Sequence, residues 1–398
     1  MTSPPGYRPT VKTWLAVLSV ALGIFTLMTT ELLPVGLLTS IGAAQRISDG
    51  MAGLMVTAPG IIAAIAAPLL TIAAGRLDRR LVLCALMTLL ALANLVSAAA
   101  PNFPTLLAAR AVVGLCIGGF WAIAGSLAVR LVPERSVGLA TSLIFGGVAA
   151  ASVLGVPAGT LIGDSSGWRG AFLALGILAL AVLVALVMLL PRLPATQAPT
   201  PHMLAGQLRN AGIVTGLAVT ALLVTGQFTA YTFADPVLQQ IAGIEVGRIG
   251  GALFLYGVAG VAGNFMAGLS ADRNLRRTTT LIIGTLAATM LLFPVLGGGV
   301  AEGIAFMGLW GLAYGGVSVT LQTWMIRAAP RATEAATALF VTVFNLSIAL
   351  GAFVGGLAVD GAGIAGALWL AGSLVLLALG FVGSAGRMTP VASPIAER

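Results

Sequence analysis

Charged residues are scarce in this sequence: only 8% of its 398 residues are Asp, Glu, Lys or Arg, whereas about a quarter are charged in an average soluble domain. Hydrophobic residues make up 59% of the chain. A chain with so little charge cannot cover a water-facing surface with polar groups. The composition therefore indicates a protein embedded in a lipid bilayer.

Histidine and cysteine are almost absent, with one histidine and two cysteines in the whole chain. Cys84 and Cys116 are too far apart for a CxxC motif and lie in long apolar runs, which favours packing over a disulfide or a metal site. His202 lies in a polar stretch and is expected to be a solvated loop residue. With scattered acids as the remaining candidates, no metal site, cofactor or enzymatic nucleophile is expected.

Long apolar runs dominate what is present. A membrane-spanning helix needs about 20 apolar residues, and repeated runs of this length favour helices over a β-barrel, whose strands have about ten residues of alternating pattern. We expect an all-α integral membrane protein with twelve transmembrane helices. They are expected at residues 13–38, 52–74, 81–100, 105–129, 137–162, 170–190, 211–235, 249–270, 279–297, 303–326, 336–358 and 364–384.

The net charge of +8 does not call for a nucleic-acid partner, because the basic residues gather in short loops on one side of the expected membrane. In the loops of the other side we find only Arg46, Arg169 and Arg248. By the positive-inside rule, this distribution predicts that both termini are cytoplasmic.

A proline-rich polar stretch at 191–209 predicts a cytoplasmic linker between two domains, 1–190 and 210–398. An internal repeat supports this division, since GLCIGG at 114–119 recurs as GLAYGG at 311–316. We expect two pseudo-symmetric six-helix bundles around a central cavity. Six further positions recur 196 residues later: Thr141, Leu143, Gly155, Gly159, Asp164 and Gly176 match Thr337, Leu339, Gly351, Gly355, Asp360 and Gly372.

Three charged residues fall within or at the end of expected membrane helices, namely Glu31, Arg110 and Asp235. Charges at such depth are costly and usually functional. Our hypothesis is that Glu31 carries protons, Arg110 modulates it, and Asp235 is a second acid at the same level. The alternatives are a structural ion pair between Glu31 and Arg110, and an ordinary hydrated loop acid at Asp235.

Polar and aromatic residues at helical spacing mark candidate cavity walls. Such faces line cavities or form hydrogen bonds between helices, and both interpretations stay open. The stripes contain Gln227, Tyr231 and Asp235; Tyr314, Ser318 and Gln322; and Tyr256 with Asn264. Weaker candidates, for which packing is the alternative, are Phe120, Trp121, Trp324 and Asn345.

Two basic loops follow the second and eighth helices. The loop with Asp272, Arg273, Arg276 and Arg277 resembles the G-x-x-x-D-R-x-G-R-R signature of the major facilitator superfamily, with Leu275 at the second Gly. The loop with Asp78, Arg79 and Arg80 is about two residues shorter than that signature. The resemblance implies charge contacts that latch the cytoplasmic side closed, and the alternative is plain positive-inside anchoring.

The fifth helix carries Gly155-Val156-Pro157-Ala158-Gly159, which resembles an element of the superfamily's antiporters, with helix packing as the alternative. The chain as a whole is similar to the drug:proton antiporter-1 branch, and within it to bacterial sugar efflux transporters and purine ribonucleoside efflux pumps. Four stretches carry this similarity: TTELLPVGLL at 29–38, GGFWA at 118–122, GWR at 167–169, and GQFTAY at 226–231 with Pro236.

The resemblance implies a monomeric carrier in a bacterial inner membrane that exports a small solute in exchange for protons by alternating access. Sugars, nucleosides and drug-like compounds all suit the uncharged polar and aromatic stripes. Two rival functions stay open, a uniporter or importer without proton exchange and a membrane sensor without transport.

Overall fold

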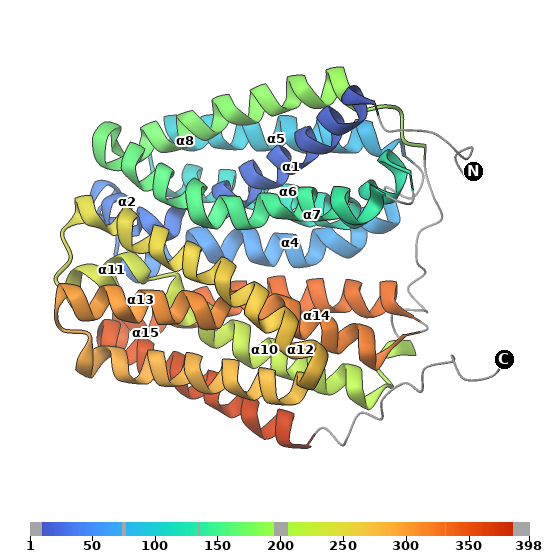
Figure 1. Ribbon diagram of the computed structural model, residues 1–398. Helices are drawn as coiled ribbons and strands as arrows, with labels where there is room; N and C mark the ends of the chain where they lie inside the picture. Colours follow the sequence, from blue (N-terminus) through green and yellow to red (C-terminus); the bar gives the residue numbers. More distant parts are fainter. Residues whose placement is uncertain (1–9, 74–76, 134–135, 195–205, 331, 385–398) are drawn as a thin grey trace.

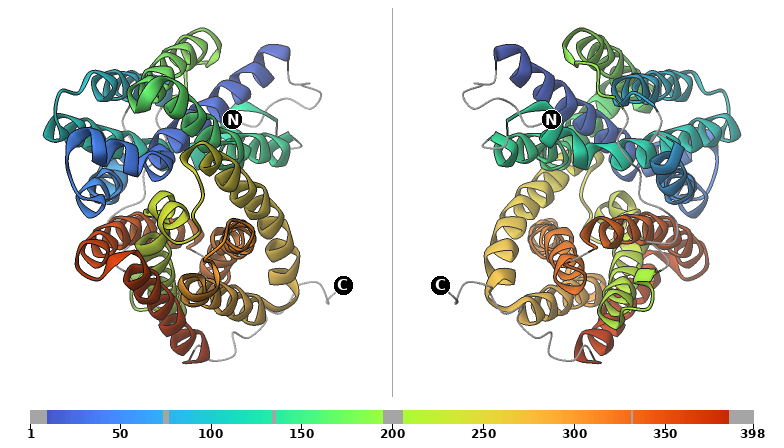
Figure 2. Two further views of the ribbon diagram at one scale, coloured as in Figure 1. Left: turned by 90° about the vertical axis from the view of Figure 1, so that its left-hand side faces the viewer. Right: turned by 90° about the vertical axis from the view of Figure 1, so that its right-hand side faces the viewer.

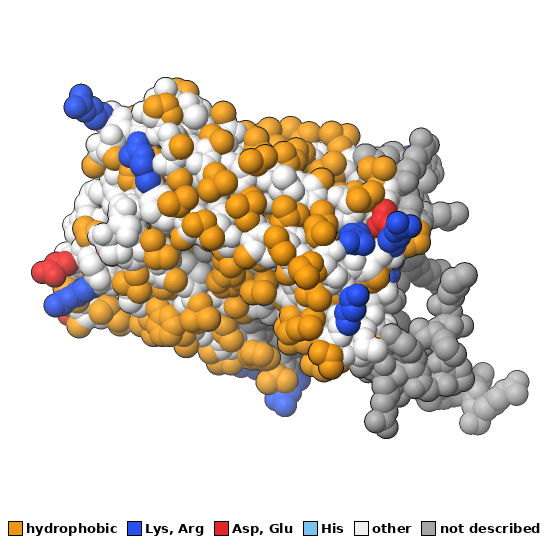
Figure 3. Space-filling view, turned by 90° about the horizontal axis from the view of Figure 1, so that it is seen from above, with side chains coloured by type: hydrophobic (Ala, Val, Ile, Leu, Met, Phe, Trp, Pro, Cys, Tyr) orange, Lys and Arg blue, Asp and Glu red, His pale blue; other side chains and the backbone are white. Residues whose placement is uncertain are grey.

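The computed structural model describes residues 10–73, 77–133, 136–194, 206–330 and 332–384. Within these ranges the ordered elements are helices and no strand is present. Most of the long helices run along one common direction (Figure 1). On the face drawn in Figure 3, hydrophobic side chains cover the middle, while most charged side chains lie toward the two ends. The surface therefore has the apolar belt of a membrane protein.

Among the described residues, ten helical segments are long and apolar enough to cross a membrane. Two of them, Leu139–Leu189 and Ala335–Gly383, have 51 and 49 residues, so each would be about 75 Å long if straight, against about 30 Å for the hydrocarbon core. Each reverses direction at a left-handed glycine, Gly167 (φ 75°) and Gly363 (φ 75°), and thus crosses twice. The expected all-α fold with twelve membrane helices is confirmed.

The helices form two groups that lie one above the other when viewed along the helix axes (Figure 2). The first, called the N half, consists of α1 (Val11–Leu32), the 3₁₀ helix η1 (Leu33–Gly36), α2 (Leu38–Gln45), α3 (Asp49–Ala52), α4 (Leu54–Ala73), α5 (Arg79–Ala99), α6 (Phe103–Leu131), α7 (Val137–Ala150), a π-helical turn (Ala151–Gly155) and α8 (Val156–Leu189). The second, called the C half, consists of α10 (Ala211–Tyr231), α11 (Ala234–Gln240), α12 (Val246–Leu296), α13 (Val300–Gly315), α14 (Val317–Ala328) and α15 (Thr333–Ser384).

Between the halves, residues 195–205 of the expected linker, including His202, lie outside the described ranges. The domain boundaries at 190 and 210 therefore stay a prediction. The end of the molecule where α1 begins and α15 ends is called the terminal end, and the opposite end the distal end.

Glycine contacts repeat between the halves. A Cβ added to Gly155 would lie 2.0 Å from Thr29 Oγ1, and one added to Gly351 would lie 2.4 Å from the carbonyl oxygen of Thr225. Gly351 and Thr225 stand 196 positions after Gly155 and Thr29. The contact between α1 and the start of α8 thus recurs between α10 and α15.

The halves share an apolar core only in part. One cluster of buried residues lies wholly within the N half, between Ala16 and Leu193. A second cluster joins N-half residues such as Leu33 and Met55 to the core of the C half. At the distal end, a Cβ added to Gly53 would lie 2.7 Å from the Phe233 ring. The structure is therefore closed between the halves at its distal end.

Candidate functional site

Arg110 is fully buried and lies about two turns after the start of α6. Its guanidinium group donates three hydrogen bonds to backbone carbonyls of other helices: Nε to Met55 (3.0 Å), Nη1 to Thr30 (2.7 Å) and Nη2 to Glu31 (3.0 Å). The side chain thereby connects α6 to the end of α1 and the start of α4.

Prolines explain why two of these carbonyls need a donor. In an α-helix each carbonyl accepts from the N–H four residues later. Pro34 stands four residues after Thr30, Pro59 stands four residues after Met55, and proline has no N–H. A buried carbonyl without a partner costs about 1–3 kcal/mol. Arg110 therefore supplies the hydrogen bonds that the two prolines withhold.

The carboxylate of Glu31 is not held by Arg110, which bonds only the backbone carbonyl of Glu31. The side chain is 7% exposed, and its carboxylate forms no hydrogen bond with a described residue. Its charge interacts electrostatically with the Arg110 guanidinium and, across the two halves, with the Tyr314 hydroxyl. The geometry thus differs from a structural ion pair between the two side chains.

Asn94 belongs to the same site, although the sequence analysis did not select it. It is fully buried in α5, and its Nδ2 donates to Thr30 Oγ1 (3.1 Å) and to the carbonyl of Leu90 (3.0 Å). An amide side chain within an otherwise apolar helix is the feature of the sequence that could have identified Asn94 as a site residue.

A cluster of aromatic rings surrounds Gln227 in the C half. Gln227 is fully buried; its Nε2 donates to the Tyr256 hydroxyl (3.0 Å) and its Oε1 accepts from Trp310 Nε1 (2.8 Å). Tyr231 stacks on Tyr256 with ring centroids 4.7 Å apart, and Trp310 meets both rings edge-on. Phe228 links this cluster to Tyr314, with centroids 6.3 Å apart.

The aromatic cluster is defined here as Gln227, Tyr231, Tyr256, Trp310 and Tyr314. The sequence analysis missed Trp310, although it stands four residues before Tyr314 and so extends the same stripe. The structure therefore brings members of each of the three expected stripes together in the C half, through hydrogen bonds and ring contacts between helices.

Glu31 and Gln227 occupy equivalent positions, because they are 196 residues apart. The N half therefore has an acid where the C half has an amide. The charged site and the aromatic cluster are two versions of one position in the repeated bundle.

Asp235 does not continue the polar face of α10, because α10 ends at Tyr231 and Asp235 belongs to the short helix α11. Its Oδ2 accepts from the backbone N–H of Thr39 (2.9 Å) and its Oδ1 from Gln239 Nε2 (2.6 Å). Burial raises the pKa of this carboxyl, while both hydrogen bonds oppose the rise. With 2% exposure, Asp235 is no ordinary hydrated loop acid.

Two of the weaker cavity candidates have partners within the C half. Trp324 is 2% exposed, and its Nε1 donates to the carbonyl of Gly212 (3.1 Å), which packs α14 on α10. Asn345 Nδ2 donates to the carbonyl of Val341 in its own helix (2.9 Å). Both residues form structural contacts.

The aromatic candidates of the N half pack within that half. The Phe120 ring would lie 2.9 Å from a Cβ on Gly23, and Trp121 packs on Phe145 with centroids 5.8 Å apart. Asn264 and Ser318 are exposed and Gln322 is half-buried. The helix break at Gly316, between α13 and α14, interrupts the stripe that starts at Tyr314.

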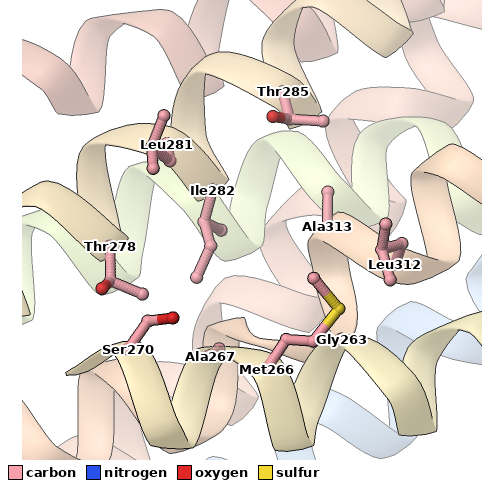
Figure 4. A pocket seen from close by; sticks show the side chains of 10 residues that line it. All are labelled: Gly263, Met266, Ala267, Ser270, Thr278, Leu281, Ile282, Thr285, Leu312 and Ala313. Atoms are coloured by element: carbon pink, nitrogen blue, oxygen red, sulfur yellow. The ribbon is translucent and has the colours of Figure 1, made fainter. Parts of the chain in front are cut away.

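A hollow of about 180 Å³ lies in the C half between the two arms of α12 and helix α13. Its lining includes Ser270, Thr278 and Leu312, and most of the lining is apolar (Figure 4). It contains none of the expected site residues. This hollow is therefore separate from both the charged site and the aromatic cluster.

The glycine-proline element of the fifth membrane helix begins at the π-helical turn. Pro157 has no N–H for the carbonyl of Val153 four residues earlier, and the chain widens into a π turn at this point. Gly155 faces α1, and a Cβ added to Gly159 would lie 2.3 Å from Leu33 Cδ1. The element thus combines a bend with close packing against α1 and η1.

The loop residues at the terminal end bond within their own halves. Asp78 begins α5, and its Oδ1 accepts from the N–H of Arg80 (2.8 Å) and of Leu193 (3.0 Å). Arg80 Nη2 donates to the carbonyl of Val187 (2.5 Å), and Arg79 is 6% exposed. These contacts tie α5 to the end of α8.

The C half repeats this arrangement. Asn274, 196 positions after Asp78, breaks α12 and accepts from the N–H of Arg277 (3.0 Å), while Arg276 donates to the carbonyl of Gly383 (2.9 Å). Arg273 is exposed. The Asp272 side chain lies outside the described part of the structure, as do residues 74–76 of the first loop.

Two repeated helical bundles, an apolar belt and buried polar sites between membrane helices define a multi-pass membrane transport protein. The chain belongs to the Major Facilitator Superfamily, whose family profile matches residues 13–352. It is accordingly a transporter of small molecules and not an enzyme.

Two relatives are similar over nearly their whole length. One is the purine ribonucleoside efflux pump NepI of Salmonella paratyphi A, 34% identical over 95% of both chains. Another is the transcription regulatory protein OpdE of Pseudomonas aeruginosa, 34% identical over 92% of both chains.

A solved structure with the same fold is a bacterial homolog of the human lysosomal transporter Spinster, in an inward-facing and occupied conformation. It matches with a TM-score of 0.77 at 15% identity, covering 95% of this chain and 97% of that one. The same homolog in an inward-facing and unoccupied conformation matches with a TM-score of 0.73.

Proposed function

We propose that this transporter exports a small polar ring compound, with purine nucleosides as the first candidates, in exchange for protons. The terminal end then faces the cytoplasm of a bacterial cell, the distal end faces outward across the inner membrane, and a single chain is the working unit. The clustering of basic residues in loops at the terminal end supports this orientation.

One observation supports the proton coupling: the Glu31 carboxylate is buried and forms no hydrogen bond with a described residue, because the three hydrogen bonds of Arg110 go to backbone carbonyls. Protonation of a buried carboxylate gives up little electrostatic stabilisation when no cation is hydrogen-bonded to it directly. The nearby Arg110 charge still favours the ionised form, so the group can release its proton when the surroundings become hydrated. Glu31 is accordingly the proton carrier of this mechanism.

The aromatic cluster supports a ring-shaped substrate. Flat aromatic side chains stack on heterocyclic rings, and Gln227 and the tyrosine hydroxyls supply hydrogen bonds for exocyclic groups and ribose. The relatives named as purine ribonucleoside efflux pumps agree with this choice. Sugars and drug-like amphiphiles are the other compounds that aromatic rings and hydrogen-bonding side chains of this kind can bind.

The test uses proteoliposomes with a preformed proton gradient. Addition of inosine or adenosine dissipates the gradient if protons are exchanged, and Glu31→Gln abolishes this dissipation while the protein stays folded. Asp164→Asn, which changes an exposed acid, is the matched control and keeps wild-type exchange. Unchanged coupling in Glu31→Gln would reject Glu31 as the carrier, and nucleoside flux without proton movement would indicate a uniporter.

A sensor without transport is the second candidate, because one similar protein is named a transcription regulatory protein. It predicts that a nucleoside raises the melting temperature of the purified protein but causes no flux in proteoliposomes. Flux measured under the same conditions would exclude it.

A further inference from the structure

Two aspartates of the C half accept hydrogen bonds from the N half at the distal end. Asp235 of α11 accepts from the N–H of Thr39 at the start of α2 (2.9 Å). Asp360 of α15 accepts from Ser48 Oγ (2.7 Å) and from the N–H of Gly50 (3.1 Å). These bonds must break whenever the halves separate at this end.

The two carboxylates differ in their contact with water. Asp360 is exposed, whereas Asp235 is 2% exposed. When the distal end closes, Asp235 therefore moves from water into the interface, while Asp360 stays hydrated. Burial of an ionised carboxylate costs far more than burial of a protonated one. Closure is thus easier once Asp235 has taken up a proton.

The acid beside Asp235 acts in the same direction as burial, whereas the two hydrogen bonds that Asp235 accepts oppose it. From the N half, α3 contributes the acid Asp49, whose charge acts on Asp235 and which is itself affected by the charge of Asp360. The helices α2 and η1 have no titratable side chain. Near the start of α12, the exposed Arg248 forms an ion pair with the exposed Glu245, with its Nε 3.9 Å from Oε2 of Glu245. The direct partners Thr39 and Gln239 are neutral donors.

The direction of the pH effect follows from the thermodynamic linkage between proton binding and closure. The structure is closed at the distal end. In this form the pKa of Asp235 is raised, and burial is the largest cause of the rise. The form with the raised pKa binds the proton more tightly, so it gains population as the pH falls through that pKa. In an open distal end, water would restore the ordinary value.

We propose that Asp235 couples proton uptake at the distal end to closure of that end, and that Asp360 is a second latch between the two halves. If the distal end faces outward, as proposed above, external protons drive the step that occludes the outward-open carrier. A proton-driven exporter needs this order of events. The inference uses that orientation but does not depend on Glu31 as the proton carrier.

The experiment measures the closed fraction directly. Spin labels on Asn102→Cys and Gly298→Cys report the distance between two exposed loop positions in the two halves, in nanodiscs of a protein lacking Cys84 and Cys116. The background also carries Glu31→Gln, so that titration of Glu31 does not contribute. Distances are recorded between about pH 8 and about pH 4, a range that brackets a raised aspartate pKa.

With Asp235 present, the closed fraction rises as the pH falls. Asp235→Asn is expected to be closed at all pH values, to the extent reached by the parent protein at low pH. Asp360→Ala is expected to lower the ratio of closed to open molecules about tenfold, through lost charge-assisted hydrogen bonds, with the pH dependence kept. Asp164→Asn, the equivalent acid 196 positions before Asp360, is the matched control and has no effect.

Three results would overturn the proposal. The closed fraction of the protein with Asp235 could be independent of pH, it could rise with pH, or Asp235→Asn could leave the pH profile unchanged. Asp235→Glu guards against a folding defect, because it keeps a titrating group and should keep a pH-dependent profile. Failure of the proposed transport function is seen separately, as an absence of nucleoside-driven proton flux, and leaves this distance measurement valid.

Discussion

Replacement of Arg110 by methionine tests the inferred partnership between this side chain and two prolines. The change removes three charge-assisted hydrogen bonds to buried carbonyls. At about 1–3 kcal/mol for each unpaired carbonyl, and with some relaxation of the helix ends, we expect a loss of about 3–5 kcal/mol in the free energy of unfolding.

The prolines offer a sharper version of this test. In a Pro34→Ala/Pro59→Ala background, backbone N–H groups become available to the carbonyls of Thr30 and Met55. Arg110→Met should then cost only about 1–3 kcal/mol, since one carbonyl, that of Glu31, still lacks its donor. A double-mutant cycle should therefore yield a coupling free energy of about 2 kcal/mol or more between Arg110 and the prolines.

The assay is chemical unfolding of the purified protein in detergent micelles, followed by tryptophan fluorescence. Arg169→Met is the control, because Arg169 is exposed and donates to one carbonyl, that of Ala100 (2.9 Å); its cost should stay below about 1 kcal/mol. Equal losses for Arg110→Met in both backgrounds would refute the role assigned to the prolines.

Three further predictions concern the cluster and the glycine faces. Gln227→Leu leaves the Trp310 N–H without its acceptor and should lower the melting temperature and weaken nucleoside binding in a thermal-shift assay; wild-type binding would contradict a role for the cluster. Gln227→Glu places an acid at the position equivalent to Glu31 and should change the number of protons exchanged per solute, measured from the reversal potential, whereas an unchanged ratio would argue against equivalence. Gly351→Ala, which meets a backbone oxygen, should destabilise more than Gly155→Ala, which meets a side chain, and Gly146→Ala, with open space, should be neutral; equal melting temperatures would reject this packing argument.

Much of the fold could be predicted because its signals are local. A run of about 20 apolar residues identifies a membrane helix wherever it stands, and the recurrence of glycines 196 residues apart indicated repeated packing, seen at Gly155 and Gly351. Helical spacing likewise brought Gln227 and Tyr231 onto one face of α10.

Helical spacing failed where a helix ends. Helical spacing predicts that the polar face with Gln227 continues to Asp235. However, α10 ends at Tyr231 and α11 starts at Ala234, and Asp235 accepts a hydrogen bond from Thr39 in the other half. Ser318 is likewise separated from Tyr314 by the break at Gly316. A periodicity argument cannot detect such breaks, because they depend on backbone bonds that neighbouring helices complete.

The sequence by itself determined the membrane class, the number of helices and the family, since these follow from hydrophobicity and motifs along the chain. Only the tertiary structure decided what the buried polar groups bond. Arg110 meets carbonyls orphaned by prolines on two other helices, Gln227 meets Trp310 from α13, and Asp235 meets the N half. Hydrogen bonds act over about 3 Å, and proximity at that scale is set by how helices pack.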